Sequence, residues 1–206
     1  MLKQYYEKDK IEIGLDEAGR GCLFGPVCVA GVVWLDEDPT NDNKFMIKDS
    51  KKIKPEKRGE IKDYIKDNCI AYDVQLISSQ YIDKYNILES TLEGMHKCID
   101  TITSYLKVDR ILVDGPHFNF YKNIPHTCII NGDNTYKSIA CASILAKTYR
   151  DEWINNLVDT YPELEKYDIK NNKGYGTNKH LEAIKQYGLT KWHRRTFGIC
   201  KNIIQN

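Results

Sequence analysis

Residues 11–21 read Ile-Glu-Ile-Gly-Leu-Asp-Glu-Ala-Gly-Arg-Gly, and this stretch decides the fold. Apolar side chains occupy every second position from 11 to 15, which is the period of a strand with one buried face. Two carboxylates, Asp16 and Glu17, close this predicted strand, and glycines follow at positions 19 and 21. Adjacent acids at a strand end have little structural purpose, so the stretch predicts a sheet edge that carries a functional site.

Four further stretches predict the remaining strands. Residues 27–35 are almost continuously apolar and β-branched, which is typical of a strand covered on both faces. Residues 71–77 alternate again, and short apolar runs at 110–113 and 127–130 indicate two more strands. The short connections among the first strands favour antiparallel pairing at the start of the sheet.

Helical patterns occupy much of the rest of the chain. Pro55 suits a first helical turn, and apolar residues at helical spacing predict helices over 88–106 and 138–157. A last helix is expected over 178–187, ended by Gly188 as its C-cap. Strands followed by strand–helix alternation predict an α/β protein with a mixed sheet flanked by helices. With no convincing linker, we expect one domain over 1–206 whose C-terminal portion, about 160–206, is helical.

The composition is that of a folded globular protein. Of the 206 residues, 41% are hydrophobic and 29% are charged, with a formal net charge of +1. A near-neutral total still permits nucleic-acid binding, because a local basic face is sufficient. A solvated face explains either basic stretch taken alone. These stretches comprise Lys48, Lys51, Lys52, Lys54, Lys57 and Arg58, and Lys191, His193, Arg194, Arg195 and Lys201.

The seven cysteines are widely spaced and form no C-x-x-C pair. An odd number at such spacing argues against a disulfide framework and against a zinc site, and it indicates a reducing compartment. The first ten residues are polar, with no apolar stretch that could act as a signal peptide. The longest apolar run, 27–35, is too short to span a bilayer. We therefore expect a cytoplasmic protein with no membrane segment.

Four acids stand at or just after predicted strand ends: Asp16, Glu17, Asp114 and Asp133. Strand ends in α/β sheets are where ligands bind. Converging carboxylates repel one another unless a cation neutralises them. Oxygen ligands favour Mg²⁺ or Mn²⁺ over zinc, and a pair of such ions suits phosphodiester cleavage.

Two of these acids also have a plain structural explanation. Asp133 could be the N-cap of the helix that follows it. Asp114, which precedes Gly115 and Pro116, could be a turn former. The adjacent pair Asp16 and Glu17 is harder to explain in this way.

Several short motifs, in one order along the chain, resemble those of ribonuclease HII, the type 2 ribonuclease H, in its bacterial form. The resemblance runs from Ile11 to Phe197. Cys22 stands where that family usually has proline. The motifs are Asp16-Glu17-Ala18-Gly19-Arg20-Gly21 with Gly25-Pro26-Val27, Asp49-Ser50-Lys51-Lys52, Val113-Asp114-Gly115, Gly132-Asp133 with Ser138-Ile139-Ala140 and 142–147, Lys173-Gly174-Tyr175-Gly176-Thr177, and His193-Arg194-Arg195-Thr196-Phe197.

The resemblance implies an RNase H-like fold with a five-stranded mixed sheet. It implies Mg²⁺- or Mn²⁺-dependent hydrolysis by a monomer that leaves a 5′-phosphate and a 3′-hydroxyl. The expected substrates are RNA–DNA hybrids and DNA duplexes with embedded ribonucleotides. The family's catalytic, metal-holding acids fall on the same four carboxylates reached from the strand ends, Asp16, Glu17, Asp114 and Asp133.

Substrate contacts are expected at six further positions. The glycines of the Gly19-Arg20-Gly21 loop let its backbone approach a sugar, and Arg20 can add a phosphate contact. The motifs around Lys51 and Lys147 suggest phosphate contacts there, although a plain surface lysine is an equal alternative. The resemblance places the Tyr175 ring against the sugar that follows the ribonucleotide; otherwise it would be a tyrosine that packs a loop.

Two other classes of protein remain open from the sequence. A junction resolvase or integrase-type nuclease also groups acids at strand ends, and it would cut an all-DNA substrate. A non-catalytic nucleic-acid-binding module would bind a hybrid without Mg²⁺ and cut nothing.

Overall fold

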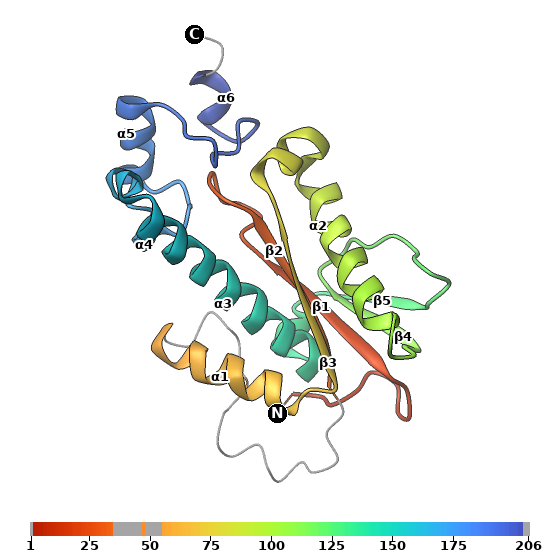
Figure 1. Ribbon diagram of the computed structural model, residues 1–206. Coiled ribbons are helices and arrows are strands. Elements are labelled where there is room, and N and C mark those ends of the chain that lie inside the picture. The colour runs from red at the N-terminus through yellow and green to blue at the C-terminus, as the bar shows by residue number, and fades with distance from the viewer. Residues whose placement is uncertain (1, 35–46, 48–54, 204–206) are drawn as a thin grey trace.

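The computed structural model describes residues 2–34, 47 and 55–203 (Figure 1). It contains a five-stranded sheet in the order β3-β2-β1-β4-β5. Strands β2 and β3 are antiparallel to their neighbours, whereas β4 and β5 continue parallel to β1. The mixed sheet with an antiparallel start is therefore confirmed. The strands are β1 Glu12–Ala18, β2 Val27–Val33, β3 Ala71–Ile77, β4 Arg110–Asp114 and β5 His126–Ile129.

The helices follow the predicted order with small shifts at their ends. The predicted helix over 88–106 begins earlier, at Ser79, and is interrupted at Asn86, whose φ of 68° is not helical. The Asn86 side chain accepts the N–H groups of Leu88 and Glu89, so it caps the second part of the helix. The helices are α1 Pro55–Asn68, α2 Ser79–Thr103, η3 Gly132–Asn134, α3 Lys137–Thr160, η4 Pro162–Tyr167, α4 Ile169–Asn172, α5 Asn178–Tyr187 and α6 Cys200–Ile203.

The two long helices cover opposite faces of the sheet (Figure 1). On one face, Leu15 and Val29 pack with Met95 of α2. On the other face, Ala30 packs with Leu145 of α3. Strand β2 is buried along its whole length, as its continuous apolar sequence predicts. Each aliphatic side chain buried in this way stabilises the fold by roughly 1.5–3 kcal/mol.

Glycines allow both helices to approach the sheet closely. A Cβ on Gly14 of β1 would lie 2.5 Å from the backbone of Ser138 and Ile139 at the start of α3. A Cβ on Gly94 of α2 would lie 2.6 Å from the side chain of Val29. The start of α3 therefore lies directly against the strand that carries Asp16.

The C-terminal helices form a further packed region beyond the sheet. They lie at one end of the molecule, beside the C-terminal part of α3 (Figure 1). A core cluster there joins Phe24, from the loop after β1, to Ile154 of α3, Tyr167 of η4 and Ile184 of α5. The helical C-terminal portion is thus packed against the loop that follows the first two acids. Among the described helices, none is both long enough and apolar enough to span a membrane.

Candidate active site

The pairing of β1 with β4 brings two acids to the same sheet edge. The strands are parallel, and Leu15 is paired with Val113, so Asp16 and Asp114 follow at equivalent positions. Strand β1 continues two residues beyond Asp16 through its pairing with β2. Asp16 and Glu17 therefore lie near the end of β1 rather than after it.

A cleft of about 300 Å³ lies at this edge. It brings together three of the four predicted acids, Asp16, Glu17 and Asp114, with most of the predicted substrate contacts. Asp133 is not among its lining residues, and Lys51 lies outside the described residues. The rest of the lining is Ala18, Gly19, Arg20, Gly21, Ser143, Lys147 and Tyr175.

Each cleft acid has a local hydrogen-bond or ion-pair partner. Asp16 Oδ1 accepts the N–H of Glu17 at 2.6 Å, and the Ser143 side chain of α3 also bonds to Asp16. A Glu17 carboxylate oxygen lies 3.1 Å from the Arg20 guanidinium. Asp114 Oδ1 accepts the N–H of Gly132 at 2.7 Å. Ser143 was not singled out as a site residue from the sequence, although it stands within a matching motif.

The cleft concentrates negative charge that these partners only partly offset. Burial raises the pKa of Asp16 well above its ordinary value, and repulsion from Glu17 and Asp114 raises it further. Burial also raises the pKa of Glu17, despite the opposing effect of Arg20. Such a site favours either a proton or a cation, and carboxylate oxygens are ligands for hard divalent ions.

The charge and the donor atoms therefore fit a divalent cation. Within the part of the chain that the structure describes, however, no three acidic, histidine or cysteine side chains surround one point as a ready metal site. The carboxylates point to their separate partners, Arg20 for Glu17 and Gly132 for Asp114. Gathering them around an ion requires these side chains to turn.

Asp133 lies in η3, next to the residue that bonds to Asp114. Its side chain is buried, and one carboxylate oxygen accepts the Asn134 side-chain amide at 2.9 Å. The N-cap of α3 is Tyr136, so the explanation of Asp133 as a helix N-cap is wrong. The structure therefore places the fourth acid beside the cleft but not in its lining.

The Asp114 carboxylate makes a hydrogen bond outside its own turn. Gly115 adopts a φ of 92° and donates its N–H to Ile129. The Asp114 carboxylate instead bonds to Gly132, which is 18 residues away. Asp114 therefore links the end of β4 to the segment that carries Asp133.

Two buried arginines hold the loop after β1. Arg150 of α3 donates to the carbonyls of Phe24, Pro26 and Lys173 at 2.7–3.0 Å. Arg194 donates to the carbonyls of Arg20 and Gly25 at 2.8 and 2.9 Å. We call these two residues the arginine clamp.

The clamp explains why residue 19 is glycine. Gly19 has a φ of 88°, and a Cβ there would lie 2.0 Å from the Arg150 Nε. Arg150 was not singled out from the sequence. A signal did exist, because it stands four residues from both Ala146 and Ile154 on the buried side of α3. A charge at a core position of a helix calls for buried partners.

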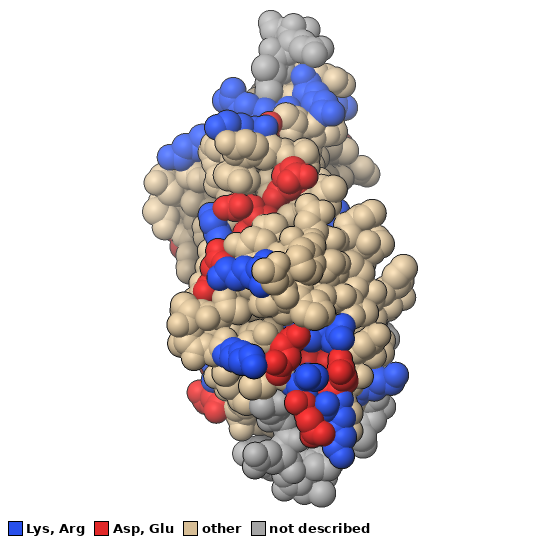
Figure 2. Space-filling view, turned by 90° about the vertical axis from the view of Figure 1, so that its right-hand side faces the viewer, with Lys and Arg blue, Asp and Glu red and all other residues tan. Residues whose placement is uncertain are grey.

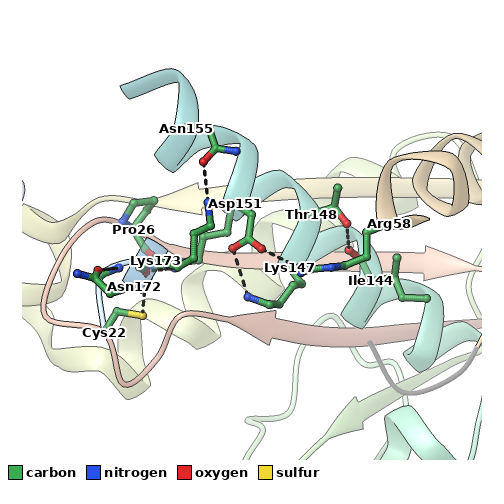
Figure 3. A network of polar contacts seen from close by, with 12 residues as sticks. Cys22, Pro26, Arg58, Ile144, Lys147, Thr148, Asp151, Asn155, Asn172 and Lys173 are labelled. Carbon is green, nitrogen blue, oxygen red and sulfur yellow. Dashed lines mark hydrogen bonds and ion pairs between the residues drawn. The ribbon is translucent and has the colours of Figure 1, made fainter. Parts of the chain in front are cut away.

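Lys147 belongs to a cationic group that shares one carboxylate (Figure 3). Lys147 Nζ lies 3.2 Å from one oxygen of Asp151, and the Arg58 guanidinium lies 2.7 Å from the other. Lys173 bonds to Asn155 at 2.6 Å, and burial lowers the pKa of Lys173. A single acid thus offsets several cations beside the cleft, which suits a phosphate contact.

On the face shown in Figure 2, basic and acidic side chains lie interspersed around a broad uncharged area. This distribution agrees with the formal net charge of +1. Among the described residues that line or adjoin the cleft, the group around Lys147 supplies a local concentration of positive charge.

Tyr175 lines the cleft together with the Gly-Arg-Gly loop. Its side chain is 46% exposed, so a ring face is available to a ligand. Its hydroxyl contacts the Cys22 thiol, and Cys22 also donates to the Lys173 carbonyl. Cys22 thus links the loop to Tyr175.

The comparisons with known proteins agree with these observations. A sequence profile of the family Ribonuclease HII matches residues 13–200. The Ribonuclease HII of Bacteroides thetaiotaomicron is 44% identical over 199 residues, covering 97% of this chain and 95% of that protein. The chain is also similar to two solved structures, and these likenesses confirm the RNase H-like fold.

The first structure is ribonuclease H2 from Pyrococcus horikoshii OT3, with a TM-score of 0.74 and 26% identity over 94% of this chain and 97% of that one. The second is Bst-RNase HIII in complex with Mn²⁺, with a TM-score of 0.73 and 18% identity. It covers 95% of this chain and 70% of that one, and its likeness concerns the fold alone.

Proposed function

The chain belongs to the ribonuclease HII family, and on that premise we propose that it is an endoribonuclease with two related substrates. It hydrolyses the RNA strand of RNA–DNA hybrids, and it incises 5′ of ribonucleotides embedded in DNA. Both reactions leave a 5′-phosphate and a 3′-hydroxyl. The observation that carries the proposal is the single cleft that contains Asp16, Glu17 and Asp114 together with the Gly-Arg-Gly loop and Tyr175.

Asp16, Glu17, Asp114 and Asp133 are the proposed holders of two Mg²⁺ or Mn²⁺ ions. Bound divalent ions would supply an activated water and stabilise the leaving 3′-oxygen. The raised pKa of Asp16 supports this assignment, because burial and then repulsion from Glu17 and Asp114 disfavour its charge unless a cation is present. Asp133 is included because the neighbouring Gly132 is bonded directly to Asp114.

The protein's own groups position the substrate. A Cβ on Gly21 would meet no atom within 4 Å, so the backbone there faces open space that a sugar can enter. Backbone groups at such a position can bond to a 2′-hydroxyl, the group that distinguishes RNA from DNA. Arg20 would exchange its bond to Glu17 for a phosphate oxygen.

Tyr175 is the proposed reader of the junction between RNA and DNA. Its exposed ring can pack on the sugar that follows the ribonucleotide, where a deoxyribose fits flat against a ring better than a ribose does. Contacts to phosphate are proposed for Lys147, which lines the cleft, and for Lys51. Such contacts position a duplex without reading its sequence.

Several properties of the whole protein are part of the same proposal. We propose that the chain acts as a monomer and as one domain over residues 1–206, because α3 contributes to the core clusters on both the sheet and the C-terminal helices. All seven cysteines are free thiols. This supports a reducing location such as the cytoplasm.

The decisive experiment compares three duplexes of one sequence: all-DNA, DNA with a single ribonucleotide, and a full RNA–DNA hybrid. With Mg²⁺ we expect cleavage of the second and third, with the single cut mapped 5′ of the ribonucleotide and a 5′-phosphate on the product. Cleavage of all-DNA would instead indicate a resolvase-type nuclease. Binding without cleavage would indicate a nucleic-acid-binding module.

A further inference from the structure

Two histidines outside the proposed mechanism form a buried pair. His180 of α5 and His193, from the segment after α5, are 0% and 1% exposed. Their Nε2 atoms lie 3.1 Å apart, which is a hydrogen-bond distance. The rings of Phe24 and Tyr167 pack against both of them.

The outer nitrogen of each ring determines where the protons are. His193 Nδ1 receives the backbone N–H of Thr190 at 2.9 Å, so this nitrogen must carry a lone pair. His180 Nδ1 lies 2.9 Å from the carbonyl oxygen of Tyr175, so this nitrogen must carry a proton. Neutral imidazole has one nitrogen that carries a proton and one that carries a lone pair. His193 therefore has its proton on Nε2 and donates it to the bare Nε2 of His180.

A charged ring would break this chain of bonds. A second proton on His193 would face the Thr190 N–H, and a second proton on His180 would face the His193 Nε2–H. Burial agrees with neutrality, because it lowers the pKa of His193 to about 3 and also lowers the pKa of His180. The order of donors is thus fixed from Thr190 through both rings to Tyr175.

Both ends of the chain lie on segments that build the cleft. Thr177, two residues after Tyr175, caps α5 by accepting the N–H of His180. At the other end, His193 forms a backbone bridge with Phe24 in the loop after β1. The two rings therefore connect the segment of Tyr175 to the segment that is paired with Phe24, shortly after the Gly-Arg-Gly loop.

We propose that His180 and His193 are positioning residues, a neutral imidazole relay that holds the Tyr175 backbone and so sets how its ring meets the junction sugar. This inference rests on the proposed role of Tyr175. The Tyr175 carbonyl has one further constraint in the same turn, because it also accepts the Thr177 N–H at 2.9 Å. The relay adds a contact between this turn and the segment after α5, beside the direct bond from the Leu23 N–H to the Gly174 carbonyl at 2.8 Å.

The proton positions can be tested in the unmodified protein. With ¹⁵N-labelled histidine at neutral pH, we expect His193 to be protonated on Nε2 alone and His180 on Nδ1 alone. We also expect a scalar coupling between the two Nε2 atoms across their hydrogen bond. The same tautomer on both rings, or a charged ring at this pH, would overturn the relay.

The positioning role can be tested by variants at His193. His193→Gln keeps a donor near the Nε2 position, whereas His193→Leu removes it. We expect His193→Leu to lower kcat/KM for the single-ribonucleotide duplex by about tenfold, the loss of roughly one hydrogen bond. We expect the glutamine variant to recover most of that loss, and cleavage of a uniform hybrid to fall by less than the junction reaction in both variants.

Two controls separate the possible failures. His96 is a partly buried histidine that stacks on Tyr121 and does not line the cleft. His96→Leu should not change the ratio of the two activities. Tyr175→Ala is measured beside it. An unchanged ratio in Tyr175→Ala would refute the proposed junction reader. A changed ratio there, with an unchanged ratio in His193→Leu, would refute the relay alone.

Discussion

The sheet edge and the loop beside it are stabilised in opposite ways. At the edge, Asp16 is buried and Glu17 is partly buried near Asp114, and the pKa of Asp16 is raised by burial and mutual repulsion. In the loop, the arginine clamp buries two cations whose hydrogen bonds go to backbone carbonyls. The edge therefore keeps charge that a ligand can neutralise, while the clamp uses its charge to hold the backbone. Removing a charge should thus have opposite effects on stability in the two regions.

The largest effect is expected for the acids. Asp16→Asn and Asp114→Asn should each lower cleavage by about a thousandfold or more, because a carboxylate proposed to hold the metal loses its charge. Both variants should stay folded, since asparagine can still accept the N–H that each aspartate accepts. The measurement is cleavage of the single-ribonucleotide duplex, with circular dichroism for folding. An unfolded variant would show that its acid is structural.

The same Asp16→Asn variant should be at least as stable as the parent protein in EDTA. The folded-state pKa of Asp16 lies well above its ordinary 3.8. Its ionised form therefore destabilises the fold at pH above that raised pKa, and the penalty disappears as the pH falls below 3.8. We expect a higher Tm for Asp16→Asn at neutral pH, with a difference that shrinks on acidification. A difference that grows instead would contradict the charge-repulsion account.

The clamp should show the reverse behaviour. Arg150→Met removes three hydrogen bonds, including those to the carbonyls of Phe24 and Pro26, so we expect it to lower the free energy of unfolding by about 3 kcal/mol. The matched control is Arg195→Met, because Arg195 is exposed and its loss should change stability by at most about 0.5 kcal/mol. Urea denaturation checks both. Equal stability of the two variants would show that the clamp is dispensable.

Tyr175 tests whether the loop region reads the substrate. Tyr175→Ala should lower cleavage at a single ribonucleotide by about a hundredfold, because the ring face is lost. Tyr175→Phe should stay within about threefold, since it loses only the hydroxyl that contacts Cys22. Single-turnover kinetics on one junction substrate measure both. Wild-type cleavage by the alanine variant would exclude Tyr175 as the junction reader.

The smallest effect is expected for Lys147. Lys147→Ala should weaken binding to all duplexes alike and reduce the slope of log affinity against log salt by about one. The control is Lys107→Ala, because Lys107 is 89% exposed and precedes β4, at the opposite end of that strand from Asp114. Fluorescence anisotropy at several salt concentrations gives the slopes. An unchanged slope for Lys147→Ala would show that its charge serves only Asp151.

The two regions also differ in how far the sequence predicted them. The acids could be placed because strand alternation and strand order are local patterns, and Leu15 and Val113 belong to runs that are easily identified. The roles of Gly14 and Ser143 depend on the packing of α3 against β1. This packing is a tertiary contact that no local sequence pattern shows. Asp133 was expected with the other acids, but it lies one residue beyond the contact between Asp114 and Gly132.

The loop contacts could not be predicted in the same way. Arg150 bonds to a carbonyl 124 residues away, and no periodic pattern connects such positions. The histidine pair depends on the tautomers that Thr190 and Tyr175 impose. The part of α2 before Asn86 was not predicted, because the apolar spacing that indicates this helix begins at Leu88.

The sequence separation within the arginine clamp has a consequence for protein synthesis. Arg194 bonds to the carbonyl of Arg20, which is 174 residues earlier in the chain. At about 5–20 residues per second, the Gly-Arg-Gly loop is synthesised roughly 10–35 seconds before Arg194. We therefore expect the acids to acquire their neighbours in the sheet before the loop beside them is closed.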